Sequence, residues 1–352
     1  MAGSGKIGIK DVAREAGVAL STVSHALNGT APISNEVRMK VLAVAQRLGY
    51  LAERKAKATI AALGTVLLAV HKDQLPHNEI NLFSWTMLSG LARECERLGV
   101  KLVPYSPEGP LEHRPIVSAA QDAGADGIII VAQDRYELLN GIRQSGVPAV
   151  LMNGEDQDMC IDSVVPSNRF AARAATNFLI SQGHRRIMHL TWGDRTTVRR
   201  RQEGFLDALA GNGLPIDDAC ILRAGGYEPS YGEEAVTKWI AEHGGMNGVT
   251  ALFCAADNLA VGALRALSSA GLSVPGDVSV MGFDGVTLGE LLNPPLTTMR
   301  VPIPQMGPAA LALLEQNIVA RDSERAAQRL ELGCSLIVRA SVGSPSERVA
   351  RG

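Results

Sequence analysis

Residues 9–28 read Ile-Lys-Asp-Val-Ala-Arg-Glu-Ala-Gly-Val-Ala-Leu-Ser-Thr-Val-Ser-His-Ala-Leu-Asn. Apolar residues recur with a helical period on both sides of Gly17, which predicts two short helices. Glycine ends a helix in a left-handed turn at the least steric cost. This pattern is typical of a helix-turn-helix, whose second helix lies in the DNA major groove, although other pairs of helices share the spacing.

A third helix is predicted directly after this pair. Ser34 can cap it with its side chain, and Val37, Val41, Ala45 and Leu48 would form its inner face. Three helices within fifty residues predict a small headpiece. Three motifs, Asp11-Val12-Ala13, Ala16-Gly17-Val18 and Thr22-Val23-Ser24, are similar to those of the lactose-repressor (LacI/GalR) family, as are Leu27-Asn28-Gly29 and Leu48-Gly49-Tyr50.

The second helix of the pair is the expected DNA-reading element. Leu20 and Ser21 open it and should face base edges, with His25 one turn further on. The family usually has arginine at the His25 position, and histidine offers a single donor at neutral pH, so base discrimination should differ there. The expected phosphate contacts, which set the register without reading sequence, come from Thr22, Ser24, Asn28 and Ser34.

Residues 51–62 are predicted to be a linker. In the resembled family this segment is a hinge that enters the DNA minor groove as a helix and wedges a base step with leucine. The expected hinge residues here are Ala56, Thr59 and Ile60, with Thr59 at the usual leucine position and Ala52-Glu53 in place of the usual Pro-Asn. A plain charged linker is the alternative interpretation.

The distribution of charge supports a nucleic-acid-binding head. Residues 1–62 hold nine Lys or Arg against four Asp or Glu, whereas the remainder holds 25 against 32. A basic head on an acidic body is typical of a module that binds a polyanion. Five cysteines without a Cys-x-x-Cys spacing, together with a polar start and no long apolar run, predict a cytoplasmic protein with reduced thiols and no contact with the membrane.

The rest of the chain alternates between short apolar runs and segments of helical length. Apolar runs at 64–70, 101–105, 127–132 and 148–152 alternate with helical segments at 81–98, 116–123 and 135–145. A second set, with helices and strands from 169 to 282, follows residue 153. We therefore predict an α/β protein: a three-helix helix-turn-helix headpiece and a two-lobed core with parallel sheets. Residues 330–338 are predicted to form one final strand.

Motifs in the core resemble the same family's effector-binding core, which is itself similar to periplasmic sugar-binding proteins. They are Gly183-His184-Arg185-Arg186-Ile187, Gly204-Phe205, Asp257-Asn258-Leu259-Ala260, Val274-Pro275-Gly276-Asp277-Val278, Gly282-Phe283-Asp284 and Pro295-Leu296-Thr297-Thr298. The expected division is a headpiece at 1–50, a hinge at 51–62, a two-lobed effector-binding and dimerisation core at 63–344 and a polar tail at 345–352.

Candidate effector-binding residues lie where strands end, because ligands bind at the carboxyl ends of parallel strands. From the residues and from matched family positions, they are Asn81, Phe83, Asn153, Arg195, Thr197, Arg201, Tyr227 and Asp257. Arg195 and Thr197 match positions used by the family's purine-binding members. Asp257 could instead only cap a helix, and which of Arg199, Arg200 and Arg201 points inward is open.

The sequence gives no reason to expect an enzyme. Gly3-Ser4-Gly5-Lys6-Ile7-Gly8 spells a dinucleotide-binding pattern but follows no strand, and an acidic cluster (Glu155, Asp156, Asp158) is predicted to be a solvated loop. We expect no catalytic residues, no metal and no cofactor. The expected function is that of a homodimeric transcriptional regulator, a repressor of operator DNA controlled by a small molecule. A sugar is the preferred effector, a purine or other metabolite is the alternative, and a two-lobed sugar-binding protein or enzyme is less favoured.

Overall fold

The computed structural model describes residues 8–28, 35–48, 63–74, 82–193, 195–217, 220–320 and 325–345. The chain divides into two units, residues 1–63 and residues 64–352. The first unit is the head. It contains α1 (Ile9–Ala16), α2 (Leu20–Asn28) and α3 (Asn35–Arg47).

One small apolar cluster joins the three helices of the head. It consists of Val12, Ala13, Ala16, Val23, Ala26, Val41, Val44 and Ala45, with Ile9, Val18, Val37 and Leu48 packed against it. Gly17 ends α1 with a φ of +64°, and the following Val18 N–H donates to the Ala13 carbonyl at 3.1 Å. The predicted left-handed turn and the inner face of the third helix are therefore confirmed.

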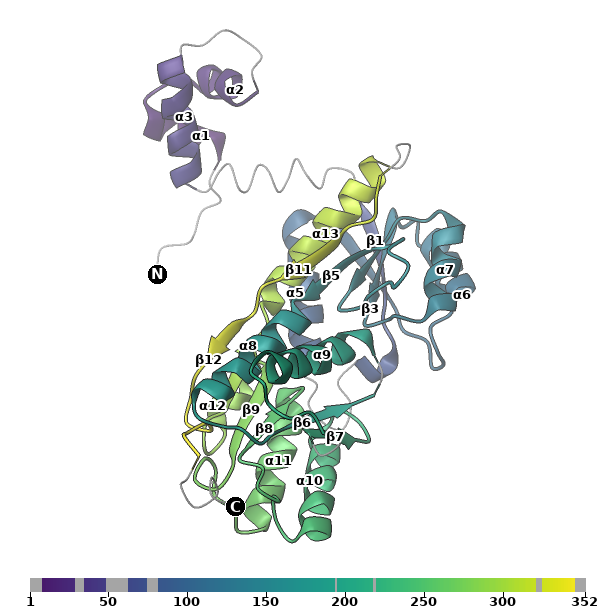
Figure 1. Cartoon of the computed structure of the whole chain (residues 1–352). Helices are drawn as coiled ribbons and strands as arrows, with labels where there is room; N and C mark the ends of the chain where they lie inside the picture. Colours follow the sequence, from purple (N-terminus) through teal and green to yellow (C-terminus); the bar gives the residue numbers. More distant parts are fainter. Residues whose placement is uncertain are drawn as a thin grey trace. The chain divides into compact units, whose positions relative to one another are not determined.

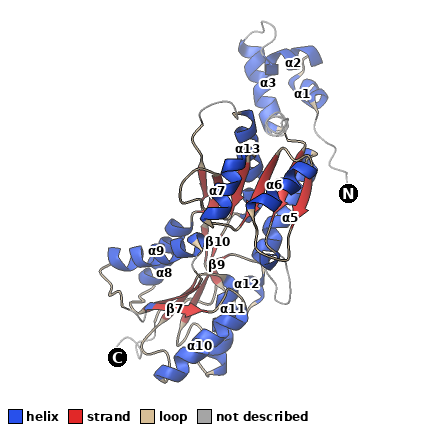
Figure 2. Ribbon diagram, turned by 90° about the vertical axis from the view of Figure 1, so that its right-hand side faces the viewer, coloured by secondary structure: helices blue, strands red, loops and turns tan. Residues whose placement is uncertain are grey.

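The second unit contains two lobes, each built on a six-stranded sheet (Figures 1 and 2). The first lobe orders its strands β11-β5-β4-β3-β1-β2, and every adjacent pair is parallel. Its strands are β1 (Thr65–Ala69), β2 (Lys101–Tyr105), β3 (Gly127–Val131), β4 (Ala149–Met152), β5 (Asp162–Pro166) and β11 (Arg329–Leu332). Its helices are η1 (Lys72–Gln74), α5 (Leu82–Leu98), α6 (His113–Asp122), α7 (Tyr136–Ser145) and α13 (Ile303–Val319).

The second lobe orders its strands β12-β10-β9-β8-β6-β7, and only the β10–β12 pair of this sheet is antiparallel in the described part of the chain. Its strands are β6 (Ile187–Trp192), β7 (Ile221–Ala224), β8 (Ala251–Cys254), β9 (Ser279–Asp284), β10 (Thr297–Arg300) and β12 (Ser335–Ile337). Its helices are α8 (Asn168–Ser181), α9 (Thr196–Gly211), α10 (Pro229–His243), α11 (Asp257–Ser269) and α12 (Leu288–Leu291).

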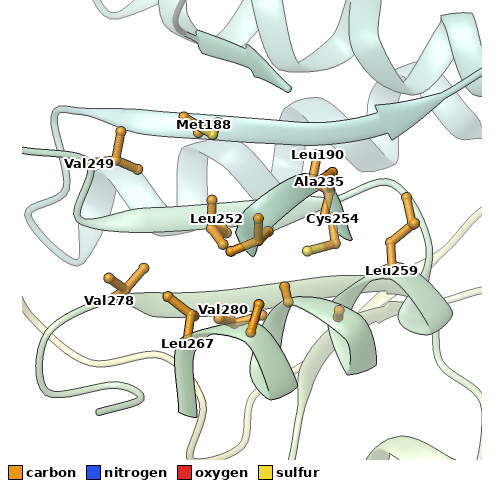
Figure 3. Close-up of a cluster of buried hydrophobic side chains, with 14 of the residues drawn as sticks. Met188, Leu190, Ala235, Val249, Leu252, Cys254, Leu259, Leu267, Val278 and Val280 are labelled. Atoms are coloured by element: carbon orange, nitrogen blue, oxygen red, sulfur yellow. The ribbon is translucent and has the colours of Figure 1, made fainter. Parts of the chain in front are cut away.

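Helices cover both faces of each sheet, which explains why the strands read as continuous apolar runs (Figure 1). In the second lobe, α8 and α9 pack together on one face and α10 and α11 on the other. Figure 3 shows the core beneath α11, where Leu259 and Leu267 meet Leu190, Leu252 and Val280 of the sheet. The predicted fold class is confirmed.

The structure differs from the sequence-based expectation in details that include β5 and the last predicted strand. β5 is absent from the predicted strands because its sequence, Asp-Ser-Val-Val-Pro, contains only two strongly apolar residues. The single strand predicted at 330–338 is two strands, β11 in the first sheet and β12 in the second. Between β11 and β12 the chain crosses from the first lobe to the second, so these neighbouring strands pair with different sheets.

Candidate functional site

The exposed side of α2 carries the residues expected to read DNA bases. Val23 and Ala26 are buried in the head, whereas Leu20 is 44% exposed and Ser21 is exposed. His25 is half-buried. The helix therefore turns its amino-terminal residues, Leu20 and Ser21, away from the core of the head, which a major-groove helix requires.

The expected phosphate contacts are described only in part. Thr22 and Ser24 are half-buried on α2. Asn28 ends this helix, but its side chain lies outside the described residues, as does the whole of Ser34. The expected hinge residues Ala56, Thr59 and Ile60 and the expected effector contact Asn81 also lie outside them.

A cavity lies between the two lobes of the core and encloses about 670 Å³, including space open to solvent. Seven of the expected effector residues line it: Phe83, Asn153, Arg195, Thr197, Arg201, Tyr227 and Asp257. Further lining residues were not expected: Gln74, Ser84, Trp192, Val198, Ala256, Asn258, Asp284 and Val286. Asn153, Trp192, Asp257 and Asp284 stand at or just beyond the carboxyl ends of strands, as the parallel topology requires.

Arg201 is the arginine of its run that enters the cavity wall, with 4% of its surface exposed. Its Nη1 donates to Asp284 Oδ1 at 3.0 Å and to the Ala255 carbonyl at 2.5 Å, and its Nε donates to Asn168 Oδ1 at 2.9 Å. The guanidinium carbon also lies 3.9 Å from the centroid of the Phe283 ring. This geometry fixes the guanidinium plane and presents a charged donor next to a carboxylate.

Asp284 is the partner of this arginine and was missed by the sequence analysis. It ends β9 with a φ of +117°, a conformation that non-glycine residues rarely adopt. Burial raises its pKa to about 6, while the charge and hydrogen bond of Arg201 lower it. Its position at the end of a predicted strand, within Gly282-Phe283-Asp284, was the signal that could have identified it.

Asp257 lines the cavity, yet both of its oxygens are engaged by the protein. Thr298 Oγ1 donates to Oδ1 at 2.6 Å, and the Val286 N–H donates to Oδ2 at 2.9 Å. Burial and then the charge of Asp284 raise its pKa to about 7. Ala256, not Asp257, is the N-cap of α11, so the simple capping interpretation is wrong. Asp257 instead ties the start of α11 to the segment after β9.

Arg195 and Asn153 meet across the cavity from opposite lobes. Arg195 Nη2 donates to the Asn153 carbonyl at 2.5 Å. Arg195 Nε and Asn153 Oδ1 are both buried without a hydrogen-bond partner in the described part of the chain. Burial lowers the pKa of Arg195 and the charge of Asp134 opposes this. A buried donor and a buried acceptor without partners are costly unless a ligand satisfies them.

Aromatic side chains supply the apolar walls of the cavity. The rings of Trp192 and Tyr227 lie 6.2 Å apart between centroids and are tilted by 48°. Phe83, on α5 of the first lobe, also lines the cavity, whereas the neighbouring Trp85 is 56% exposed. Phe83 therefore contributes to the cavity, and Trp85 lies at the surface.

The acidic cluster after β4 was expected to be a solvated loop, and this is true only in part. Asp158 is exposed as expected, whereas Glu155 is buried. Glu155 is only 1% exposed and pairs with arginines, while Asp156 accepts the N–H groups of Cys160 and Ile161. Within the residues that the structure describes, no group of three or more His, Cys, Asp or Glu could hold a metal ion. No described helix has the length and apolar content needed to cross a membrane.

Comparison with known proteins gives the family. A profile described as "Bacterial regulatory proteins, lacI family" matches residues 8–53, and one described as "Periplasmic binding protein-like domain" matches residues 176–342. The HTH-type transcriptional repressor PurR of Photobacterium profundum is 30% identical over 341 residues, covering 95% of this chain and 98% of the relative. PurR of Vibrio parahaemolyticus is 30% identical over 338 residues with the same coverage.

Solved structures agree with this assignment. A complex described as "transcriptional regulator CelR-cellobiose complex" superposes with a TM-score of 0.69 at 26% identity, covering 96% of this chain and 100% of that one. A lac repressor dimer bound to operator and the anti-inducer ONPF gives 0.68 at 24% identity, with coverage of 96% and 99%, and supports the fold. The chain therefore belongs to the lacI family of bacterial regulatory proteins and is an effector-controlled, DNA-binding transcriptional repressor rather than an enzyme.

Proposed function

We propose that the cavity between the lobes binds the effector and that α2 reads the operator through Leu20, Ser21 and His25. The observation that carries the effector site is a pair of buried atoms, Arg195 Nε and Asn153 Oδ1, that have no hydrogen-bond partner among the described residues. They come from different lobes, so a ligand that satisfies both also joins the lobes. Effector binding would then favour one arrangement of the lobes over another, which is the condition for control at a distance.

The effector class that we favour is a sugar. Neighbouring hydroxyls both donate and accept, and they match the donor–acceptor pair of Arg201 with Asp284 and that of Arg195 with Asn153. The tilted pair of Trp192 and Tyr227 offers an apolar surface to the ring of a sugar. A complex of a related regulator with cellobiose is consistent with this class.

A purine is the second candidate, and two observations favour it. The relatives that are 30% identical over most of the chain are repressors named PurR. Arg195 and Thr197, which match positions used by the family's purine-binding members, both line the cavity. A planar heterocycle would stack against the aromatic walls and use the donor of Arg195 at its edge.

We also propose that the protein acts as a homodimer in the cytoplasm. Two copies would place their α2 helices in successive major grooves, about 34 Å apart, on a near-palindromic operator. The expected division of labour is a reading head, a hinge at 51–62 and a core that dimerises and binds effector.

A thermal-shift screen followed by titration tests these proposals. Glucose, ribose, cellobiose, hypoxanthine and guanine are screened first, since a ligand at 100 times its Kd stabilises by about 2.7 kcal/mol. For each compound that binds, its Kd is then measured with and without operator. Reciprocal coupling requires operator and effector to change each other's affinity by the same factor. Equal effector affinities in the presence and absence of operator would contradict control through this cavity.

A further inference from the structure

Glu155 is a buried carboxylate that stands between two arginines. Arg200 Nε, from α9 in the second lobe, lies 3.3 Å from Glu155 Oε2. Arg329 Nη2, from β11 in the first lobe, lies 2.7 Å from Glu155 Oε1. The two groups form an ion pair, but their geometry is not that of a hydrogen bond. Glu155 belongs to the loop after β4 of the first lobe, so its contact with Arg200 crosses from one lobe to the other. We name these three residues the inter-lobe clasp.

The loop that carries Glu155 is held in one shape. The Asp156 carboxylate accepts N–H groups from Cys160 at 2.8 Å and Ile161 at 3.0 Å. Gly154 packs closely against the backbone of Gln133, so that an added Cβ would lie 2.2 Å from the Gln133 carbonyl oxygen. These contacts hold the backbone on both sides of Glu155, so the loop offers its carboxylate to α9 from a fixed position.

The clasp continues into the charges around it. Arg200 also bonds Glu203 at 3.0 Å within α9, and Glu203 faces Arg169 of α8 at 3.7 Å. On the other side, Arg329 pairs with Glu331 at 3.1 Å, and Ser167 Oγ donates to Glu331 at 3.1 Å. Burial raises the pKa of Glu155 and Glu331 adds to this, whereas Arg329 and Arg200 lower it. Separation of the lobes would remove Arg200 from Glu155 and leave Arg329, of the same lobe, as its cationic partner.

The clasp lies beside the effector cavity and does not line it. Asn153, two residues before Glu155, and Arg201, directly after Arg200, are both cavity residues. The clasp and a bound ligand therefore join the same two segments. A second link of the same kind is the Thr196 N–H, at the start of α9, which donates to Asp134 of the first lobe at 2.6 Å.

We propose that Glu155 is a positioning residue for effector binding: through Arg200 it holds the two lobes in the arrangement that encloses the cavity, without touching the effector. The inference rests on the proposed role of the cavity. If the clasp pre-forms this arrangement, part of the cost of closing the lobes is met before the ligand arrives. Without the clasp, a smaller fraction of the molecules is closed before the ligand arrives. The apparent affinity for the effector falls in proportion to that fraction.

The test compares Glu155→Gln, Arg200→Met and the double variant in the full-length protein. Glu203→Gln is the matched control, because Glu203 also bonds Arg200 but lies in the same helix, so its loss breaks no contact between lobes. The first measurement needs no ligand. Deuterium uptake at the Thr196 amide reports the lobe contact directly, since the bond that the structure describes for this N–H crosses the cleft. Faster uptake is expected in both single variants and not in Glu203→Gln.

The second measurement is the Kd of whichever of glucose, ribose, cellobiose, hypoxanthine and guanine binds the wild type. Each clasp variant should bind about ten-fold more weakly, within the usual range of coupling between sites, and the double variant no more weakly than the singles. Uptake and affinity equal to those of the control would overturn the proposal, as would additive losses in the double variant. If none of the compounds binds, the choice of effector classes fails while the amide exchange still decides the role of Glu155.

Discussion

Replacing Arg201 by methionine tests the charged wall of the cavity. The substitution removes the ion pair with Asp284 and the hydrogen bonds to Asn168 and the Ala255 carbonyl, and it leaves a buried carboxylate alone. Breaking a buried ion pair on one side costs about 3–5 kcal/mol. We therefore expect the unfolding free energy of the core to fall, and the full loss of this size applies where Asp284 is ionised.

The protonation of Asp284 makes the loss depend on pH. Its pKa is about 6 in the wild type and rises further when Arg201, which lowers it, is removed. The pKa of Asp284 is higher in the folded state than in the unfolded state. The stability that protonated Asp284 contributes is therefore full below its unfolded pKa and is lost as the pH rises towards its folded pKa. In the wild type this loss levels off above pH 6 or so, whereas in Arg201→Met it continues at about 1.4 kcal/mol per pH unit. Between about pH 5.5 and about pH 7.5 the variant should lose about 2 kcal/mol more than the wild type.

The assay is urea unfolding at the two pH values, with tryptophan fluorescence as the signal. Trp85, Trp192 and Trp239 all belong to the core unit, so the signal does not include the head. Arg199→Met, an exposed neighbour on α9, is the control and should change little. Adding Asp284→Asn to Arg201→Met should abolish the extra dependence on pH. A loss that is the same at both pH values, or that matches Arg199→Met, would refute the reasoning.

Three further predictions concern the head and the helix packing. Gly17→Ala places an L side chain at a φ of +64° with no atom nearby to clash, so the head should lose about 1–2 kcal/mol by amide exchange in the full chain, and unchanged exchange would contradict this. Gly204→Ala puts a Cβ 2.0 Å from the Arg169 carbonyl oxygen and should lower the free energy of urea unfolding by about 1–3 kcal/mol. Gly211→Ala, on the same helix, should not lower it. Equal effects of the two substitutions would argue against the close packing of α8 on α9. His25→Arg should shift operator preference towards guanine at one position per half-site, and a randomised-operator selection that returns one sequence for both proteins would count against base contact by this residue.

Patterns among residues close in sequence were enough to predict most of the helices and strands of this protein. The apolar spacing around Gly17 predicts the two helices, because a helix places residues three and four apart on one face. The apolar runs predict parallel strands covered on both faces. Since parallel strands direct their carboxyl ends to one edge, candidates such as Asn153 and Tyr227 could be predicted from strand ends together with matched family positions, and both line the cavity.

The tertiary structure alone decided which charges are buried and which partners they have. Three consecutive arginines, Arg199 to Arg201, are chemically alike, and only the packing of α9 sends one into the cavity wall and one to Glu155. Glu155 reads as a solvated acid because its partners lie 45 and 174 residues further along the chain. The division of β11 from β12 likewise depends on distant strands, because each pairs with a different sheet. Local sequence specifies the element, whereas the burial of a charge depends on whether distant segments bring an opposite charge to it.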